Sequence, residues 1–436
     1  MCGSEAYGGC TVRHFSKPST GLLGHGLSIL CVMASAAGLG VIPAYGQSLS
    51  QSQADILSGN CSSIGLARGP QLSAVCALAS GVANAPEGGS PTGPADQGGE
   101  DQERRMKQRL DYLRNQKSGN TIPQMSQFAQ ASGSGAMTDA SGSGGMFDIG
   151  PLSGFANFEY QNVSKRTTYF TNGFDSDRYG GIVGVDHSFD NIVLGATFEY
   201  YHTDADFKSS SGNFKTDSYG GSLYGSVSPQ PNMFIDASIG YAHMDTTINR
   251  GVTFAIGGAA LTPLGNASGT PSSDQYRGNI SGGYDFVHDN ITFGPRVGWA
   301  YSRNKVDAFR ETGSTGLELA FGEQTYESLT SSVGGRATMA ISTSFGVIVP
   351  QLSADYIHEF KDNQQTFTAH FVQDLNAAPT NLVFQTDQPD RNYYALGIGV
   401  VLGLPHGISS FVNYRALVGD ALKTTQTVTA GVRMEF

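Results

Sequence analysis

The C-terminal end of the chain alternates between polar and apolar residues, and this period of two constrains the fold more than any other feature of the sequence. One series is Thr425, Thr427, Thr429, Gly431, Arg433 and Glu435, and the other is Val428, Ala430, Val432, Met434 and Phe436. Successive side chains of a β-strand point to opposite faces, so the pattern predicts a strand with one polar and one apolar face. Comparable alternation recurs about a dozen times upstream, which indicates an all-β protein.

The apolar faces are rich in aromatic residues near the expected strand ends. These include Tyr179, Tyr200, Tyr219, Tyr241, Tyr301 and Tyr356. A soluble β-sandwich, the alternative fold, packs its apolar face inward and rarely gathers aromatics at strand ends. A membrane barrel turns the apolar face toward lipid and carries aromatic girdles at both interfaces. The pattern favours the membrane barrel.

Twelve strands are predicted, an even number typical of single-chain bacterial barrels. They lie near 152–163, 177–188, 191–202, 216–228, 232–245, 275–287, 291–304, 327–341, 345–360, 391–404, 408–417 and 425–436. Each is long enough to cross a bilayer as a tilted strand. Tight turns alternate with longer polar loops near 164–176, 203–215, 246–274, 305–326 and 361–390. We assign the turns to the periplasm and the loops to the outside, as in outer-membrane barrels.

The predicted fold is an all-β membrane protein. A 12-stranded antiparallel transmembrane β-barrel, residues 151–436, follows a short, partly helical, low-complexity N-terminal region. Fifty-eight glycines and 14% charged residues suit close-packed strands better than a globular enzyme. The net charge of −11 argues against a nucleic-acid partner, which calls for a basic surface.

Residues 1–46 have the layout of a secretory signal peptide. Arg13, His14 and Lys17 precede an apolar run over about 22–42, and cleavage is expected between Gly46 and Gln47. A transmembrane anchor is the alternative.

Cys61 and Cys76 are the two cysteines that follow the predicted signal. In an oxidising periplasm we expect them to form a disulfide, and two small buried residues on a helix pair are the alternative.

Two further segments separate the signal from the barrel. Residues 47–99 are expected to form a short passenger-like segment that ends in a flexible Pro/Gly/Ser-rich linker. Residues 100–150 combine helix candidates over 100–116 and 122–131 with a Gly/Ser-rich tract. We expect 100–150 to be a linker that could thread the pore.

Short motifs in the barrel region resemble those of the autotransporter (type V secretion) β-domain. They are Arg178-Tyr179-Gly180-Gly181, Asp217-Ser218-Tyr219-Gly220-Gly221, Phe234-Ile235-Asp236-Ala237-Ser238, Gly294-Pro295-Arg296, Pro350-Gln351-Leu352 and Gly431-Val432-Arg433-Met434-Glu435-Phe436. The resemblance implies insertion in the bacterial outer membrane by the barrel-assembly machinery, with Val432, Met434 and Phe436 as the assembly signal. The chain differs from typical members of that family in its short upstream segment, which leaves no room for a large β-helical passenger.

The sequence contains no recognisable catalytic, cofactor-binding or metal-binding motif, so we expect no enzyme activity and no cofactor. Charged residues on the polar strand faces are interpreted as lumen charges, because a lipid-facing charge costs about 2–4 kcal/mol at mid-bilayer. They are Glu199, Asp236, Arg277, Asp285, Arg296, Arg336, Asp355 and Arg433.

Two functions remain open. The first is an autotransporter barrel that translocates or anchors a short passenger at the cell surface. The second is a stand-alone porin-like or structural barrel whose N-terminal segment stays in the periplasm or plugs the pore. Expected partners are outer-membrane lipid and lipopolysaccharide, the assembly machinery, periplasmic chaperones and a host or cell-surface ligand for the passenger.

Overall fold

The computed structural model describes residues 83–84, 148–149, 152–168, 170–189, 191–208, 212–256, 262–404 and 408–434. The predicted signal peptide and its cleavage site, Cys61 and Cys76, the helix candidates and Phe436 lie outside these residues. The side chains of 432–434 also lie outside the description. Predictions about these parts of the chain remain predictions.

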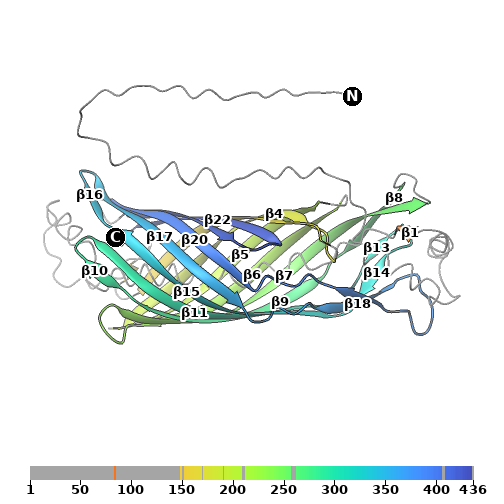
Figure 1. The fold of residues 1–436 in the computed structure, drawn as a ribbon, viewed down its shortest axis with the longest axis horizontal. Coiled ribbons are helices and arrows are strands. Elements are labelled where there is room, and N and C mark those ends of the chain that lie inside the picture. Colours follow the sequence, from red (N-terminus) through yellow and green to blue (C-terminus); the bar gives the residue numbers. More distant parts are fainter. Residues whose placement is uncertain are drawn as a thin grey trace, which may run out of the picture. The chain divides into compact units, whose positions relative to one another are not determined.

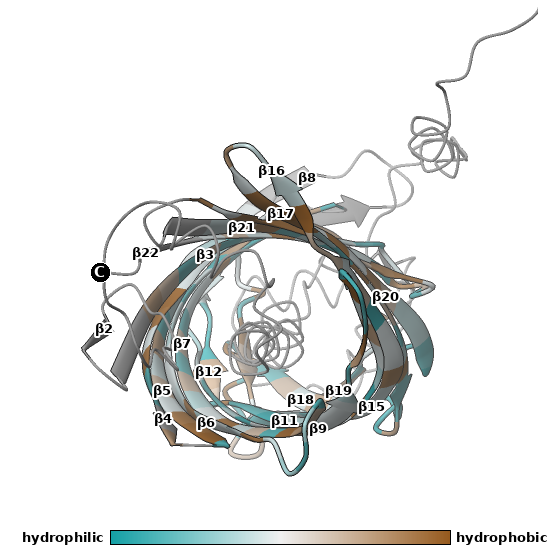
Figure 2. Ribbon diagram, turned by 90° about the vertical axis from the view of Figure 1, so that its left-hand side faces the viewer, coloured by the Kyte–Doolittle hydropathy of each residue, from teal (hydrophilic) through white to brown (hydrophobic). Residues whose placement is uncertain are grey.

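Twelve strands form one closed antiparallel barrel (Figures 1 and 2), as the sequence predicted. They are β3 (Leu152–Lys165), β4 (Phe174–Phe189), β5 (Ile192–Phe207), β6 (Asn213–Val227), β7 (Met233–Ile256), β9 (Ser272–Tyr284), β11 (Ile291–Val306), β15 (Gln324–Met339), β17 (Gly346–Glu359), β20 (Asn392–Gly403), β21 (Ile408–Val418) and β22 (Lys423–Met434). Each pairs with the next, and β22 pairs with β3 from Lys423↔Lys165 to Gly431↔Asn157. This last pairing closes the wall.

The two ends of the barrel differ. At one end, short turns join consecutive strands, and β10 (Phe286–His288) and β16 (Ile341–Thr343) extend two of these hairpins. Asn232 and Asp289 adopt left-handed φ angles of 67° and 52° in these turns, a conformation that Asn and Asp tolerate better than most residues. The opposite end carries the long connections (Figure 1).

An apolar band covers the outer surface of the barrel. Its exposed residues include Val183, Leu223, Ile239, Val333, Leu352 and Ile398, whose exposed fractions lie between 54% and 64%. Neighbours on the opposite face, such as Ser222 and Ser238, are polar and buried. Among the described residues, none lies in a helix long and apolar enough to cross a membrane.

Tyrosines mark the edge of the apolar band nearer to the long connections. Each hydroxyl donates a hydrogen bond to a side chain on the next wall strand. The pairs are Tyr160–Asp177 (2.6 Å), Tyr200–Asp217 (2.7 Å), Tyr241–Asp274 (2.6 Å), Tyr301–Glu327 (2.9 Å) and Tyr356–Asn392 (2.5 Å). An apolar ring with a polar tip suits the boundary between lipid and water.

Beyond this tyrosine ring the inner face of the wall becomes apolar and the outer face becomes polar. Ala205, Phe207 and Phe214 are buried in an inward-facing apolar cluster. Asp204 and Lys215 form an ion pair of 2.8 Å on the outer side. Several strands therefore extend past their predicted ends. The predictions required apolar residues to face outward along the whole strand, whereas in these extensions the apolar residues face inward.

The long connections build further strands where the sequence analysis expected polar loops. β12 (Phe309–Arg310), β14 (Leu319–Phe321), β18 (Thr366–Phe371) and β19 (Leu382–Gln385) form a separate antiparallel sheet, here called the loop sheet. β7 continues to Ile256 and pairs with β8 (Thr262–Gly269), which in turn pairs with β13 (Thr312–Gly313). The expectation of polar loops was wrong here, because alternate residues such as Phe367, Ala369 and Phe371 share a buried core.

We expect a lysine at position 352 to destabilise the barrel far more than a lysine at position 351. Leu352 lies on the apolar band midway along β17, whereas Gln351 lies on the inner face. Leu352→Lys should cost about 2–4 kcal/mol because it places a charge near the bilayer midplane. Gln351→Lys is the matched control.

The loss should appear as a lower temperature at which the detergent-folded protein acquires the gel mobility of the unfolded chain. Equal losses for the two variants would contradict the assignment of faces.

Candidate functional site

A buried ion pair lies along the inner face of the barrel wall. The Arg277 guanidinium on β9 donates a hydrogen bond to the Glu199 carboxylate on β5, and both side chains are at most 4% exposed. Strands β6 and β7 separate the two residues around the wall. Gly220 on β6 leaves room for this pair, since a Cβ atom there would lie 2.7 Å from Glu199 Oε1.

Other buried carboxylates of the interior accept hydrogen bonds from hydroxyl groups. Ser226 Oγ donates to Asp236 at 2.7 Å. Tyr224 Oη donates to Asp186 at 2.7 Å, and Thr429 Oγ1 donates to Glu159 at 3.2 Å. Hydrogen bonds of this kind offset part of the cost of removing a carboxylate from water.

Two arginines lie over aromatic rings of the interior. Arg178 is 4.2 Å from the centre of the Tyr201 ring, and Arg296 is 4.9 Å from the centre of the Phe234 ring. Arg296 also lies 3.6 Å from Asp285. Such cation–π contacts hold the guanidinium groups against the wall.

The structure locates the eight predicted lumen charges as follows. Glu199, Asp236 and Arg277 are buried on the interior face. Asp285 and Arg296 are largely buried and lie near each other. Arg336 and Asp355 are half-buried on β15 and β17. The backbone of Arg433 pairs with Ser409, and its side chain lies outside the description.

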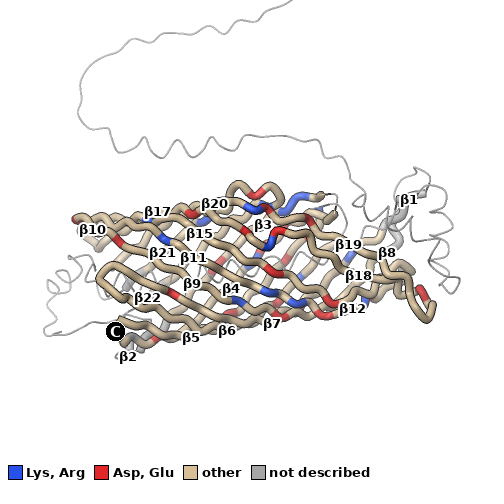
Figure 3. The backbone as a smooth tube through the Cα atoms, turned by 60° about the horizontal axis from the view of Figure 1, so that its bottom comes forward, with Lys and Arg blue, Asp and Glu red and all other residues tan. Residues whose placement is uncertain are grey.

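Functional candidates that the sequence analysis missed concentrate at the long-connection end, where Figure 3 shows most of the charged residues. Arg250 donates to both oxygens of Glu311, at 3.0 and 2.6 Å, and to the carbonyl of Leu317. Glu311 also accepts a hydrogen bond from the backbone N–H of Leu319. Both partners come from segments interpreted as polar loops, and no sequence pattern indicated that they meet.

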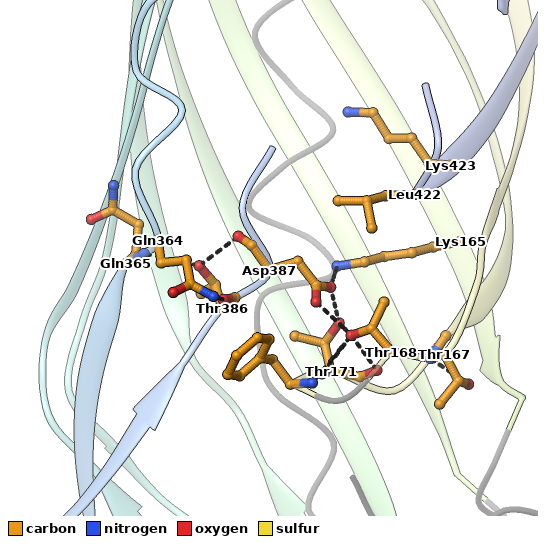
Figure 4. A network of polar contacts seen from close by, with 12 residues as sticks. Lys165, Thr167, Thr168, Thr171, Gln364, Gln365, Thr386, Asp387, Leu422 and Lys423 are labelled. Carbon is orange, nitrogen blue, oxygen red and sulfur yellow. Dashed lines mark hydrogen bonds and ion pairs between the residues drawn. The ribbon is translucent and has the colours of Figure 1, made fainter. Parts of the chain in front are cut away.

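A second polar network at this end is centred on Asp387 (Figure 4). Its carboxylate accepts hydrogen bonds from the hydroxyls of Thr168, at 2.5 Å, and Thr171, and lies 3.3 Å from Lys165 Nζ. Asp387 follows β19, whereas its partners belong to β3 and the β3–β4 connection. Residues distant in sequence are therefore joined above the barrel opening.

Asp362 and Arg391 form a third polar contact outside the membrane-spanning strands. Arg391 donates to Asp362 Oδ2 from Nε at 2.8 Å and from Nη2 at 2.5 Å. The hydrogen bond from this guanidinium lowers the pKa of the Asp362 carboxyl below its ordinary value. The contact ties the segment after β17 to the start of β20.

The interior therefore presents a polar surface on which charged groups are paired with opposite charges or accept hydrogen bonds from hydroxyl groups. Such a surface can accommodate an extended polypeptide, whose backbone amides need hydrogen-bonding partners. Among the residues that the structure describes, no group of three or more His, Cys, Asp and Glu side chains is placed to hold a metal ion.

Comparison with known proteins relates the barrel to one family. Residues 154–415 match the family described as the autotransporter beta-domain. Outer membrane protein A of Rickettsia conorii is 27% identical over 267 residues, which cover 59% of this chain and 13% of that protein. Lipase 1 of Photorhabdus luminescens is 25% identical over 253 residues, which cover 57% of this chain and 36% of that protein.

A solved structure has the same fold. The translocator domain of autotransporter NalP from Neisseria meningitidis superposes with a TM-score of 0.53 at 17% identity, covering 77% of this chain and 95% of that domain.

We expect Glu199→Gln to lower the free energy of unfolding by about 3 kcal/mol, because it leaves the Arg277 guanidinium buried without its carboxylate. Adding Arg277→Met to Glu199→Gln should recover part of that loss. The fraction of protein that keeps the folded gel mobility, followed against urea concentration, measures both effects. Additive losses in the double variant would show that the two residues do not act as a pair.

We expect Arg391→Gln to loosen the segment after β17 in a pH-dependent way. A lowered carboxyl pKa contributes stability that is present above the ordinary aspartate value of about 3.9 and is lost as the pH falls through the lower folded-state value. Pepsin should therefore cut the 360–391 segment of the variant faster than that of the unchanged protein at pH 5, and this difference in rate should shrink as the pH is lowered. A rate difference that does not shrink as the pH falls would exclude this pairing as the cause.

Proposed function

The chain belongs to the autotransporter β-domain family, and on this basis we propose that it carries the segment over 47–150 through its barrel and displays part of it at the cell surface. The protein is a β-barrel of the bacterial outer membrane. The chain spans only 13% of the length of Outer membrane protein A.

The position of the first wall strand carries the proposal. β3 begins at the short-turn end, where Leu152 pairs with His187 close to the β4–β5 turn. β2 (Asp148–Ile149) pairs with the first residues of β3 at the same end. In an outer-membrane barrel the short turns face the periplasm, so β2 and the start of β3 lie at the periplasmic end of the wall.

A second pairing supports a route through the lumen. β1 (Ala83–Asn84) pairs with Ala255 and Ile256 of β7, at the end that carries the long connections. β1 and β2, which precede the barrel in the chain, therefore pair with the wall at opposite ends of it. The lumen offers polar groups to a crossing polypeptide, whereas the apolar outer band offers none.

Assembly is a further part of the proposal. β22 pairs with both β21 and β3, so the wall closes only when the C-terminal strand is in place. This supports Val432, Met434 and Phe436 as the signal for the barrel-assembly machinery, with periplasmic chaperones protecting the unpaired edges beforehand.

An epitope tag at Ser52 tests surface display. We expect protease added to intact cells to remove this tag. A tag at Leu375, which is 70% exposed in a long connection, should also be lost. A tag at the β10–β11 turn, beside Asp289, should survive unless the cells are lysed.

Loss of the Leu375 tag with retention of the Ser52 tag in intact cells would contradict surface display. That result would favour a porin-like barrel whose N-terminal segment remains in the periplasm.

A further inference from the structure

The segment between β17 and β20 reaches two separate parts of the barrel rim. It leaves the wall after Glu359 and returns at Asn392, on two neighbouring strands. In one direction around the wall it reaches past β15, β11 and β9 to the β7–β8 hairpin, where Val252 and Ala267 join its apolar core. In the other it reaches past β21 and β22 to Thr168 and Thr171. It therefore extends across the external opening.

The figures agree with this arrangement. Figure 1 places β14 and β18 at the end of the barrel opposite β10 and β16. Viewed along the barrel in Figure 2, β12, β18 and β19 lie inside the outline of the wall. The loop sheet thus covers part of the external opening.

One side of the loop sheet is attached by apolar packing. Leu317, Leu319 and Phe321 pack with Phe367, Phe371 and Phe384 and with the β7–β8 hairpin in a single buried cluster. The Phe309–Phe321 and Phe367–Phe384 rings are stacked, with centroids 4.7 and 5.3 Å apart. The Arg250–Glu311 ion pair and the β8–β13 pairing add to this attachment.

The other side is attached differently. Among the described residues, the apolar cluster includes none from the β3–β4 connection. Here Asp387 is held by the hydroxyls of Thr168 and Thr171 and by Lys165. Water can replace hydroxyl and ammonium groups as partners of a carboxylate, whereas separating an apolar core exposes it to water.

We propose that the loop sheet is a hinged external lid, fixed at the β7–β8 hairpin by its apolar core and latched at the β3–β4 connection by Asp387. The latch is the contact that yields when the lid moves. This inference rests on the proposed function, because a chain leaving the lumen has to pass the lid.

A cavity beneath the latch provides a reporter of lid movement. It is lined by Ser302 on β11, Lys165, Tyr393 and Asp387, among others. Ser302→Cys is a nearly isosteric change, and in a Cys61→Ser/Cys76→Ser background it provides a thiol beneath the lid. The reaction rate of that thiol with a fluorescein maleimide added to intact cells then measures how often the lid opens.

We expect Asp387→Ala to raise this labelling rate at least fivefold. Asp374→Ala is the matched control, since Asp374 is another buried acid of the same segment and its carboxylate accepts hydrogen bonds from Asn376 and Thr380 within that segment. It should leave the rate unchanged. An unaltered heat-modification temperature in all variants would show that the barrel itself is intact.

Equal labelling rates for the two variants would overturn the latch. The outcome is separable from surface display, which the Ser52 tag reports. If protease removes the Ser52 tag but the two variants are labelled at equal rates, the lid is refuted and surface display is not. If the Ser52 tag is retained but Asp387→Ala is labelled faster than Asp374→Ala, surface display is refuted and the lid is not.

Discussion

Pairing of the backbone within a closed sheet is the constraint on which the rest of the structure depends. Lipid offers no partner to an N–H or C=O group, so a strand wall in a membrane is stable only without edges. The β22–β3 pairing meets this requirement by joining strands more than 250 residues apart. The same closure fixes the inward and outward faces of every strand. The polar lumen and the apolar band are its consequences.

Interior charge is tolerated because the wall supplies partners for it. Glu199 and Arg277 are brought together across the curvature of four strands, and the missing side chain at Gly220 gives them the space to meet. The motif Tyr219-Gly220-Gly221 thus has a physical reason in this chain: the tyrosine belongs to the outer boundary and the first glycine makes way for the buried pair. Removing one of the two side chains lowers the free energy of unfolding, because the other charge is then buried without a partner. The intact pair need not itself stabilise the fold.

The sequence predicted the wall well because one rule, alternation with apolar residues outward, applies along each membrane-spanning part. All twelve strands lie where that rule expected them. The rule failed beyond the tyrosine ring, where Ala205 and Phe207 turn inward and Asp204 turns outward. It also missed the loop sheet, although the alternation from Thr366 to Phe371 was a visible signal. Pairs such as Arg250–Glu311 could not be predicted, because they depend on how three connections fold against one another.

The reversal of face polarity at the tyrosine ring fixes the height of the protein in the membrane. A shift outward would expose Ile239 and its neighbours to water, and a shift inward would carry Asp204 and Lys215 into hydrocarbon. From Tyr200 to the end of β5 at Phe207, the wall continues for seven residues. At roughly 3.3 Å per residue and a tilt near 40°, that stretch rises about 18 Å above the boundary. The wall of the barrel therefore extends beyond the lipid headgroups into the external solution. A molecule that approaches from solution contacts this extension before it contacts the membrane.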